Sequence, residues 1–183
     1  MKAYIMSKKS KTVTLGGGCF WCVEAQFNAL DGVEKIEPGY MGGTLENPTY
    51  EQVCTGETGH AEVVNIHYNP EEISYELLIY LFFHAHDPTQ LNRQGGDIGT
   101  QYRSVIFYED QAEKESIERV INNLKENDAE FQNIVTSLEP KSTFYKAEPH
   151  HFNYYEQNPN QTYCKLVIAP KLASFKQKIK ESL

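Results

Sequence analysis

The chain has 183 residues and a mass of 21.0 kDa, which suits one domain with a sizeable core or at most two small domains. Its 40% of hydrophobic and 23% of charged residues exclude a disordered chain and a membrane protein. The formal net charge is -8 and the sequence pI is about 5.3, so neither a nucleic acid nor an anionic membrane surface is expected as a partner.

The first eleven residues are polar, with no unbroken apolar stretch and no small-residue cleavage site. We therefore expect a loose arm over residues 1–11 rather than a signal peptide, and no segment is long enough to span a bilayer. The four cysteines are too few and too unevenly spaced for a secreted disulfide framework and are typical of a reducing compartment. A cytoplasmic protein is expected.

Strand-like and helix-like patterns alternate in the first part of the chain. From Cys19 to Leu30 the apolar residues fall at helical spacing, and Gly32 ends this predicted helix. The elements predicted here are a strand over 12–15, a helix over 19–30, a strand over 33–40, a short helix over 50–54 and a strand over 61–68.

The second part of the chain continues the same mixture. Ser74 is a good N-cap, and Ile73 and Leu78 flank it as a hydrophobic staple at the start of a helix. A polar, glycine-rich stretch over 86–102 has no predicted element. The remaining predicted elements are a strand over 105–108, a helix around 117–124, strand-like residues near 144, a helix-like 150–156 and a basic tail helix around 172–179. This mixture predicts one α+β domain over residues 12–183, with a sheet covered by helices.

The segment Gly16-Gly17-Gly18-Cys19 places a cysteine at the start of a predicted helix. Glycines let the backbone turn tightly and approach a ligand closely. The free N–H groups and the dipole of a helix N-terminus stabilise the thiolate, which is the nucleophilic form of cysteine. That effect is worth at most about 2 kcal/mol, or roughly 1.5 pKa units, so another group must activate the substrate. The pattern predicts a reactive Cys19 whose thiol pKa is lowered.

The roles of the other cysteines are less clear from the sequence. Cys22 lies three residues after Cys19 on the same helical face, and it is either a redox partner or a buried packing residue. For Cys54, at the end of the predicted short helix, a buried packing role is favoured because unpaired cysteines are commonly buried and inert.

Several motifs in a fixed order give a resemblance to a known family. Gly18-Cys19-Phe20-Trp21 resembles the signature of the type A peptide methionine sulfoxide reductases, and the matching blocks run from residue 12 to residue 165. The further blocks are Gly39-Tyr40-Met41-Gly42-Gly43, Asn47-Pro48-Thr49-Tyr50, Thr58-Gly59-His60-Ala61-Glu62, His86-Asp87-Pro88, Gly95-Gly96-Asp97, Gly99-Thr100-Gln101-Tyr102-Arg103-Ser104, Asn158-Pro159 and Tyr163-Cys164.

The resemblance implies a ferredoxin-like two-layer fold and an enzyme that reduces the S epimer of methionine sulfoxide, free or in proteins. It also implies thioredoxin as the reductant, a monomer, and no metal or bound cofactor. Carried over position by position, the resemblance implies that Cys19 is the nucleophile and Glu62 the acid. It implies that Phe20 and Trp21 form an apolar wall for the methyl group of the substrate. The polar side of the pocket is implied to consist of Tyr50, Asp97 and Tyr102.

The chemistry of a sulfoxide explains why such a set of residues is needed. The sulfoxide sulfur is a poor electrophile because its oxygen leaves as a strongly basic species, so that oxygen needs a proton or hydrogen bonds. Glu62 supplies a proton near neutral pH only if burial raises its pKa. Without the family motifs, Glu62 would be interpreted as a solvated charge at a strand edge and Asp97 as a turn residue.

One position departs from the usual family pattern. The residue after Trp21 is most often glycine in the family, and here it is Cys22. Cys164 matches a usual position of the resolving cysteine, which converts the sulfenic acid to a disulfide. We favour Cys164, with Cys22 as the alternative, because a mobile tail segment reaches Cys19 without bending a helix.

Other protein classes fit the sequence less well. A thioredoxin-like oxidoreductase shares the Cys19–Cys22 spacing, but it would not need the later acid and tyrosine motifs. A metal-binding module would join these cysteines to the histidine pair 84/86 or 150/151, and structural zinc sites rarely use such pairs. A non-catalytic binding protein would retain its function without Cys19. The three glycines lack the Gly-Lys-Ser/Thr ending of a phosphate loop, which excludes a nucleotide site.

Overall fold

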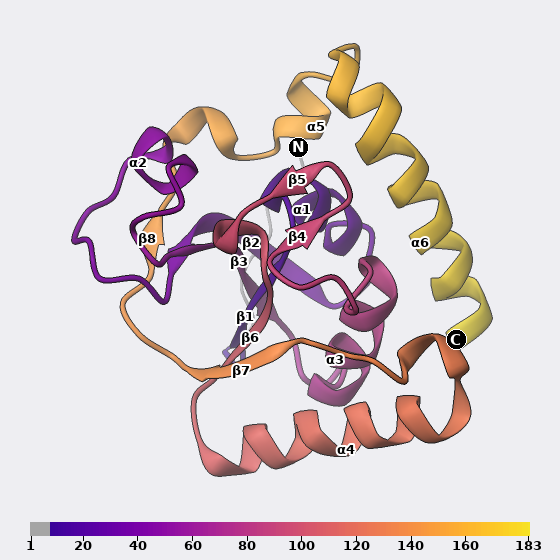
Figure 1. The fold of residues 1–183 in the computed structure, drawn as a ribbon. Helices are drawn as coiled ribbons and strands as arrows, with labels where there is room; N and C mark the ends of the chain where they lie inside the picture. Colours follow the sequence, from indigo (N-terminus) through magenta and orange to yellow (C-terminus); the bar gives the residue numbers. More distant parts are fainter. Residues whose placement is uncertain (1–7) are drawn as a thin grey trace.

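A six-stranded mixed sheet forms the centre of the molecule, and helices pack against it (Figure 1). The computed structural model describes residues 8–183, so residues 1–7 of the expected arm lie outside the described residues. The elements in chain order are β1 (Lys11–Gly17), α1 (Phe20–Phe27), β2 (Val33–Met41), α2 (Tyr50–Cys54), β3 (Ala61–Tyr68), α3 (Tyr75–Ala85), β4 (Arg93–Gln94), β5 (Asp97–Ile98), β6 (Ser104–Tyr108), α4 (Gln111–Asn127), β7 (Ser137–Pro140), β8 (Tyr145–Lys146), α5 (Tyr154–Gln157) and α6 (Ala169–Ser182).

The strand order of the main sheet is β7-β6-β1-β3-β2-β8. Its neighbours pair in antiparallel fashion, except that β6 and β7 are parallel. The segment β1-α1-β2-β3-α3-β6 contributes four central strands in the order β6-β1-β3-β2, which is the ferredoxin-like arrangement. The predicted α+β fold is confirmed.

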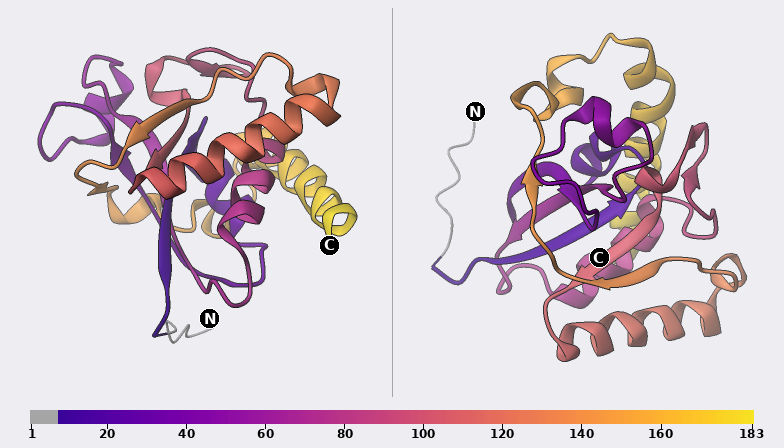
Figure 2. Two further views of the ribbon diagram at one scale, coloured as in Figure 1. Left: turned by 90° about the horizontal axis from the view of Figure 1, so that it is seen from below. Right: turned by 60° about the vertical axis from the view of Figure 1, so that its left-hand side comes forward.

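The main core lies between the sheet and its helices. Alternate residues of the central strands, such as Leu15, Val64 and Ile106, point to this side and are buried with the apolar faces of α1 and α3. The helix α6 packs against both α1 and α3, so that the end of the chain covers the helical layer (Figure 2).

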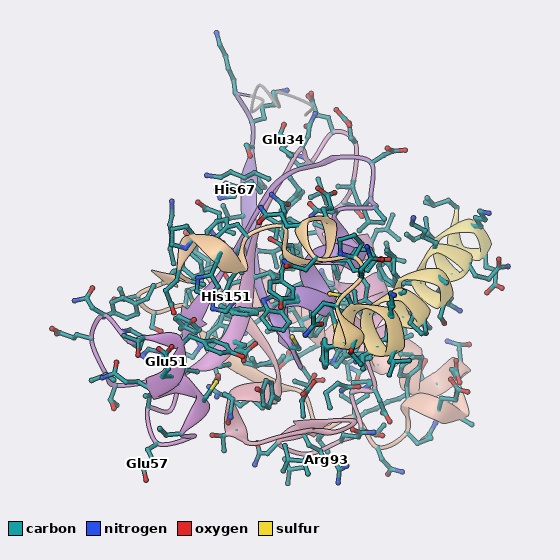
Figure 3. The ribbon with its side chains drawn as sticks, turned by 90° about the horizontal axis from the view of Figure 1, so that it is seen from above. Glu34, Glu51, Glu57, His67, Arg93 and His151 are labelled. Atoms are coloured by element: carbon teal, nitrogen blue, oxygen red, sulfur yellow. The ribbon has the colours of Figure 1, made fainter. Side chains whose placement is uncertain are left out.

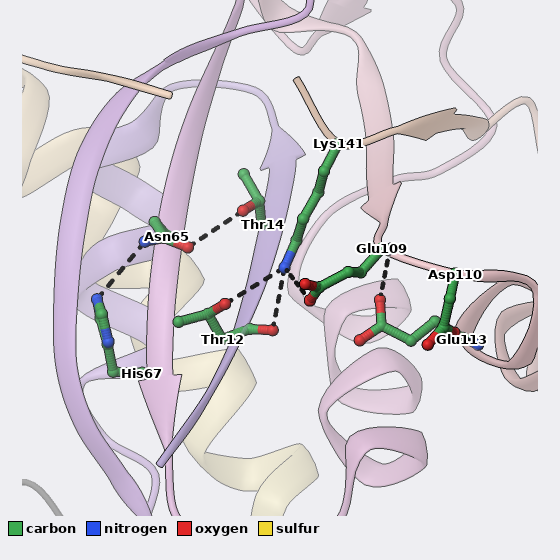
Figure 4. Close-up of polar contacts among 8 residues, drawn as sticks. All are labelled: Thr12, Thr14, Asn65, His67, Glu109, Asp110, Glu113 and Lys141. Carbon is green, nitrogen blue, oxygen red and sulfur yellow. Dashed lines mark hydrogen bonds and ion pairs between the residues drawn. The ribbon is translucent and has the colours of Figure 1, made fainter. Parts of the chain in front are cut away.

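The opposite face of the sheet is partly polar. A small apolar cluster there includes Met41, Val63 and Phe107. Farther along the same face, Thr14 donates to Asn65 at 3.1 Å, and Asn65 contacts His67 (Figure 4). This polar chain joins β1 to β3, and His67 continues it to Glu37 on β2.

The predicted helices and strands occur with some shifts in their ends. The first helix begins at Phe20, has Cys19 as its N-cap, and ends at Phe27 rather than at Leu30. The helix-like 150–156 is interrupted, because Asn153 adopts a left-handed conformation between a 3-10 turn and α5.

Two strand pairs were not predicted. The hairpin β4–β5 lies in the polar stretch over 86–102, and β7 pairs in parallel with β6, which lies 32 residues earlier in the chain. The strands β4 and β5 have two residues each and β7 has four, so each is too short to give a strand signal in the sequence.

Within residues 8–183, no helix is both long enough and apolar enough to cross a bilayer. The same residues contain no group of three or more histidine, cysteine, aspartate or glutamate side chains arranged to hold a metal ion.

Candidate active site

The predicted site residues meet at one end of the central strands. Because β1 and β3 are antiparallel, the end of β1 leads to Cys19 beside the start of β3, where Glu62 lies. The short helix α2 brings Tyr50, the 3-10 turn Thr100–Tyr102 brings Tyr102, and the hairpin brings Asp97 to the same end (Figure 1). The fold therefore gathers residues that are far apart in the sequence.

The three glycines before Cys19 allow close packing within the protein. A Cβ atom on Gly16 would lie 2.8 Å from Val105, and one on Gly17 would lie 3.0 Å from Phe82. Only Gly18, with φ of +89°, needs a backbone conformation that side chains disfavour. The expected close approach to a ligand is thus a close approach to neighbouring strands and helices, which lets β1 run directly into α1.

Cys19 is buried, with 7% of its surface exposed. Burial raises the pKa of its thiol well above the ordinary value, and the neighbouring Cys22 and Glu62 add to this effect. The sequence prediction of a lowered Cys19 pKa is therefore wrong. The helix N-terminus stabilises the thiolate, but the loss of hydration outweighs that effect.

Cys22 and Cys164 lie in the same buried cluster as Cys19. The Cys19 thiol holds the pKa of Cys22 below its usual range against the effect of burial, and Lys171 and the Tyr163 hydroxyl also favour the Cys22 thiolate. Three cysteines are thus brought together although one comes from the far end of the chain.

Cys164 does not lie in a mobile segment of irregular structure, as the sequence argument assumed. It begins a π-helical turn, Cys164–Ile168, that continues into α6, and its side chain is fully buried. The reason is the apolar face of this turn, on which Ile168 packs with Cys164 against the other cysteines.

Glu62 is almost completely buried, with 1% of its surface exposed, on the helix-facing side of β3. One carboxyl oxygen accepts a hydrogen bond from the Phe20 backbone N–H at 3.2 Å, and Oε2 makes no hydrogen bond with any group of residues 8–183. Burial raises the pKa of Glu62 to about 8, with a further contribution from Asp97. The carboxyl is therefore protonated at neutral pH and has a free oxygen, so the alternative of a solvated edge charge is excluded.

Aromatic rings surround this carboxyl and the cysteine. The Phe20 ring stacks on Tyr50 at 6.3 Å between centroids, and Trp21 stacks on Tyr50 at 6.5 Å. Burial raises the pKa of the Tyr50 and Tyr102 hydroxyls far above neutral pH, and the nearby Glu62 adds to this effect. Both hydroxyls thus keep their protons and can donate hydrogen bonds to an oxygen atom.

Asp97 connects the hairpin to the C-terminal segment. It accepts a hydrogen bond from the Tyr163 hydroxyl at 2.7 Å, and that hydroxyl lies 3.7 Å from the Cys22 sulfur. The edge of the Tyr163 ring meets Trp21 at 5.9 Å. Tyr163 therefore joins the hairpin, the cysteines and the aromatic wall.

Several residues of the site were missed by the sequence analysis. Tyr154 stacks face to face on Trp21, with centroids 3.7 Å apart and planes within 6°. The Trp21 indole donates a hydrogen bond to His151, and Glu148 accepts hydrogen bonds from the Tyr40 hydroxyl and the Tyr50 backbone N–H. The aromatic residues around Asn158-Pro159 were the available signal, but only packing shows which of them faces Trp21.

Cys54 is exposed, so the prediction that it is buried is wrong. The helix α2 is only five residues long and buries Val53 in place of Cys54. Cys54 instead lies beside Tyr50 at the rim of the site.

Comparisons with known proteins agree with this arrangement. The model of the family described as peptide methionine sulfoxide reductase matches residues 11–183. The chain is similar to the peptide methionine sulfoxide reductase MsrA of Natronomonas pharaonis, with 50% identity over 172 residues, 94% of this chain and 97% of the relative. Its structure is similar to reduced Mxr1 from Saccharomyces cerevisiae, with TM-score 0.81, 34% identity, and coverage of 89% and 94% of the two chains.

A second structure of the yeast protein, Mxr1 in complex with Trx2, is also similar to this chain. Its TM-score is 0.58 with 25% identity, and the match covers 84% of this chain and 91% of that one.

Proposed function

Because the chain belongs to the peptide methionine sulfoxide reductase family and is an oxidoreductase that reduces methionine sulfoxide, we propose that Cys19 is its nucleophile and Glu62 its acid. The observation that carries this proposal is the buried carboxyl of Glu62, which accepts the Phe20 backbone N–H at the start of the helix that Cys19 caps. We further propose that the substrate is the S epimer, free or in proteins, as the family resemblance implies.

The first step transfers oxygen from the substrate to the enzyme. The Cys19 sulfur attacks the sulfoxide sulfur while Glu62 delivers its proton to the sulfoxide oxygen. The proton of the Cys19 thiol restores the protonated Glu62. The attack joins the two sulfurs; the hydroxyl then passes from the substrate sulfur to the Cys19 sulfur as the S–O bond of the substrate and the bond between the sulfurs break. Methionine leaves, and Cys19 becomes a sulfenic acid. Protons balance in this step, so it is compatible with a thiol whose pKa is raised.

The surrounding residues prepare the substrate for this attack. Phe20 and Trp21 provide an apolar wall for the methyl group, and the Tyr50 and Tyr102 hydroxyls donate hydrogen bonds to the sulfoxide oxygen. Asp97 completes the polar side of the pocket, where its carboxylate accepts a hydrogen bond from the Tyr163 hydroxyl. Since a buried site has a low effective dielectric constant, each of these contacts is stronger than it would be in water.

The sulfenic acid is then converted to a disulfide with release of water. We propose Cys164 as the resolving cysteine, supported by its place in the same buried cluster. A specific observation favours Cys22 as the alternative, because its side chain already interacts with Cys19 and its pKa is lowered. Intact mass after one turnover of the Cys164→Ser and Cys22→Ser variants separates the two. A Cys19–Cys22 disulfide formed at the wild-type rate in Cys164→Ser would exclude Cys164.

Thioredoxin is the proposed reductant of that disulfide. The similar yeast structure was solved with Trx2, which supports a thioredoxin partner for this chain as well. Exchange with its dithiol returns both cysteines to the thiol form and oxidises thioredoxin. No other oxidant or reductant is needed for the cycle.

The test of the whole proposal is turnover of each sulfoxide epimer with a chemical dithiol. The wild type is expected to reduce the S epimer, and Cys19→Ser is expected to lose this activity. The thioredoxin-like alternative is measured in parallel by reduction of insulin disulfides. Reduction of the R epimer alone, or equal activity in Cys19→Ser, contradicts the proposal.

A further inference from the structure

A buried histidine lies behind the aromatic wall of the site. His151, with 1% of its surface exposed, ends the 3-10 turn Pro149–His151 in the middle of the molecule (Figure 3). Its ring centroid lies 4.5 Å from Tyr50, 5.2 Å from Phe20 and 5.7 Å from Trp21. One imidazole therefore contacts three of the four aromatic residues that the proposed function places around the substrate.

The contact with Trp21 is a directed hydrogen bond. The indole Nε1–H donates to Nδ1 of His151 at 3.1 Å. A nitrogen that accepts a hydrogen bond carries no proton, so the neutral ring has its proton on Nε2. That atom makes no hydrogen bond in the described structure, and the nearest carboxyl oxygen, on Glu148, lies 3.9 Å away.

This hydrogen bond restricts movement of the indole within its own plane, which stacking alone permits. Tyr154 lies parallel to Trp21 at 3.7 Å, which fixes the plane of the indole. Two stacked rings can still slide and rotate within that plane at little cost. An acceptor at the edge of the indole removes this freedom, because a hydrogen bond weakens steeply when its angle bends.

The turn that carries His151 is itself held at the site. Glu148 accepts hydrogen bonds from the Tyr40 hydroxyl and from the Tyr50 backbone N–H, each at 3.1 Å. These bonds tie the turn to β2 and to the start of α2. The imidazole is thus anchored to the same elements that carry the pocket residues.

We propose that His151 is a positioning residue, whose Nδ1 accepts the Trp21 indole N–H and so fixes the wall against which the substrate methyl group packs. This inference rests on the proposed function, in which Trp21 forms that wall. It assigns to His151 no contact with the substrate and no proton transfer.

The proposal requires the neutral form of the imidazole. The titratable groups that face the ring are Glu148 and His150 on its own turn and Tyr50 and Glu51 on α2, and α1 contributes only aromatic carbon and the indole N–H. Burial and His150 lower the pKa of His151, against the two glutamates, and so keep the acceptor available at neutral pH. Protonation at low pH places a proton on Nδ1, and the indole then loses its acceptor.

Trp21 is the only tryptophan of the chain, so its indole N–H gives a single resonance in a nitrogen-15 correlation spectrum. In the wild type this resonance is expected to titrate at acidic pH together with one histidine ring. In His151→Asn, which keeps an acceptor oxygen near the place of Nδ1 but cannot ionise, the resonance is expected to remain near its neutral-pH position through the same range. In His150→Asn, the matched control at the adjacent exposed histidine, the titration is expected to persist with its midpoint at a higher pH, because His150 lowers the pKa of His151.

Single-turnover kinetics then test the link to the substrate. In His151→Phe, which keeps an aromatic ring without an acceptor, the half-saturating sulfoxide concentration is expected to rise about tenfold, the scale of one lost hydrogen bond, with a maximal rate within about threefold of the wild type. His151→Asn is expected to recover most of this loss, and His150→Asn to behave as the wild type.

Two results would overturn the inference. One is an indole resonance in the wild type that is independent of histidine ionisation, which needs no variant and so no assumption about folding. The other is an unchanged half-saturating concentration in His151→Phe, or an equal defect in His151→Asn. The proposed function fails if Cys19→Ser keeps its activity. That result leaves the indole titration unaffected, so the two failures are distinguishable.

Discussion

At the scale of single residues, Glu62 is the clearest case in which burial creates a chemical property. Its side chain lies on the helix-facing side of β3, and its pKa is raised to about 8 chiefly by the loss of hydration. A carboxyl with this pKa donates a proton at neutral pH, which an exposed glutamate does not. The same burial makes its ionisation unfavourable for the fold.

The first prediction concerns the rate of sulfoxide reduction. Glu62→Gln is expected to slow the single-turnover reduction about 10²- to 10⁴-fold, because general acid catalysis contributes about that much. In the wild type the rate is expected to fall as the pH rises through about 8, the pH at which Glu62 loses its proton. Quench-flow measurements between pH 6 and pH 10 check this, and a wild-type rate in Glu62→Gln at pH 7 would contradict it.

The second prediction concerns stability. The folded-state pKa of Glu62 lies above the unfolded value of about 4.3, so its stabilising contribution is fully present below that pH and is lost as the pH rises through about 8. Glu62→Gln cannot ionise, and its melting temperature relative to the wild type is expected to be higher at pH 9 than at pH 5. Thermal unfolding at both pH values measures this, and an equal difference at both would refute it.

At the scale of secondary-structure elements, a group of charges holds the edge strand β8 to the sheet. The Glu37 carboxyl on β2 contacts Lys35 at 2.8 Å, Lys146 at 2.7 Å and His67 at 2.9 Å. Burial opposes ionisation of Glu37, but these partners overcome it and lower the pKa to about 2. Since β8 leads directly to Glu148 and His151, this group also supports the turn behind the aromatic wall.

The third prediction follows from these charges. Glu37→Gln is expected to lower the free energy of unfolding at pH 7 by about 2 kcal/mol, the scale of hydrogen bonds to charged groups. The contribution of Glu37 is present above about pH 4.3 and is lost as the pH falls through about 2. Urea unfolding from pH 7 downward measures the difference between wild type and variant, which should shrink in acid. A constant difference would show that ionisation is not its cause.

The C-terminal segment forms a second connection between elements, across the cysteines. The Tyr163 hydroxyl bonds to Asp97 on β5, and its ring packs against Trp21. Tyr163 thus packs against the cluster that buries Cys19, whose surface is 7% exposed. We propose that this connection limits access to Cys19.

The fourth prediction is that Tyr163→Phe opens the site more often. Loss of the hydrogen bond to Asp97 is expected to increase the rate of Cys19 alkylation by a small chloroacetamide about fivefold, the scale of about 1 kcal/mol. Mass spectrometry of digested protein follows Cys19 separately from the exposed Cys54, which serves as the internal control. Equal labelling of Cys19 in both proteins would count against such a cover.

At the scale of the whole molecule, α6 closes the helical layer. Phe175 is buried against Phe27 of α1, with ring centroids 5.6 Å apart, and the helix also packs on α3. The π-helical turn with Cys164 precedes this helix. Packing of α6 therefore determines where the third cysteine of the cluster lies.

The fifth prediction is that Phe175→Ala lowers the free energy of unfolding by about 3–5 kcal/mol, the usual cost of removing a buried aromatic ring. The exposed Ser174→Ala on the same helix is the matched control and should change stability by less than about 0.5 kcal/mol. Chemical denaturation measures both. A change in Phe175→Ala as small as that of the control would mean that α6 is only loosely attached.

The fold was largely accessible from the sequence because its central elements have strong local signals. The alternation along residues 61–68 and the N-cap at Ser74 both correspond to observed elements. The hairpin at Asp97 and the strand β7 lack such signals, since their pairing depends on partners elsewhere in the chain. The position of Cys19 at a helix start was also marked locally, by the glycines before it, while its reactivity stays a prediction.

What the sequence by itself determined is the kind of residues at the site and the order of strands and helices, because both follow from short patterns along the chain. Only the tertiary structure decided how those residues behave. Burial raises the pKa of Glu62 and of Cys19, and packing brings Cys164 and His151 to a site more than 100 residues away. Hydration, hydrogen bonding and proximity depend on all the neighbours of a residue in space, and those neighbours come from every part of the chain.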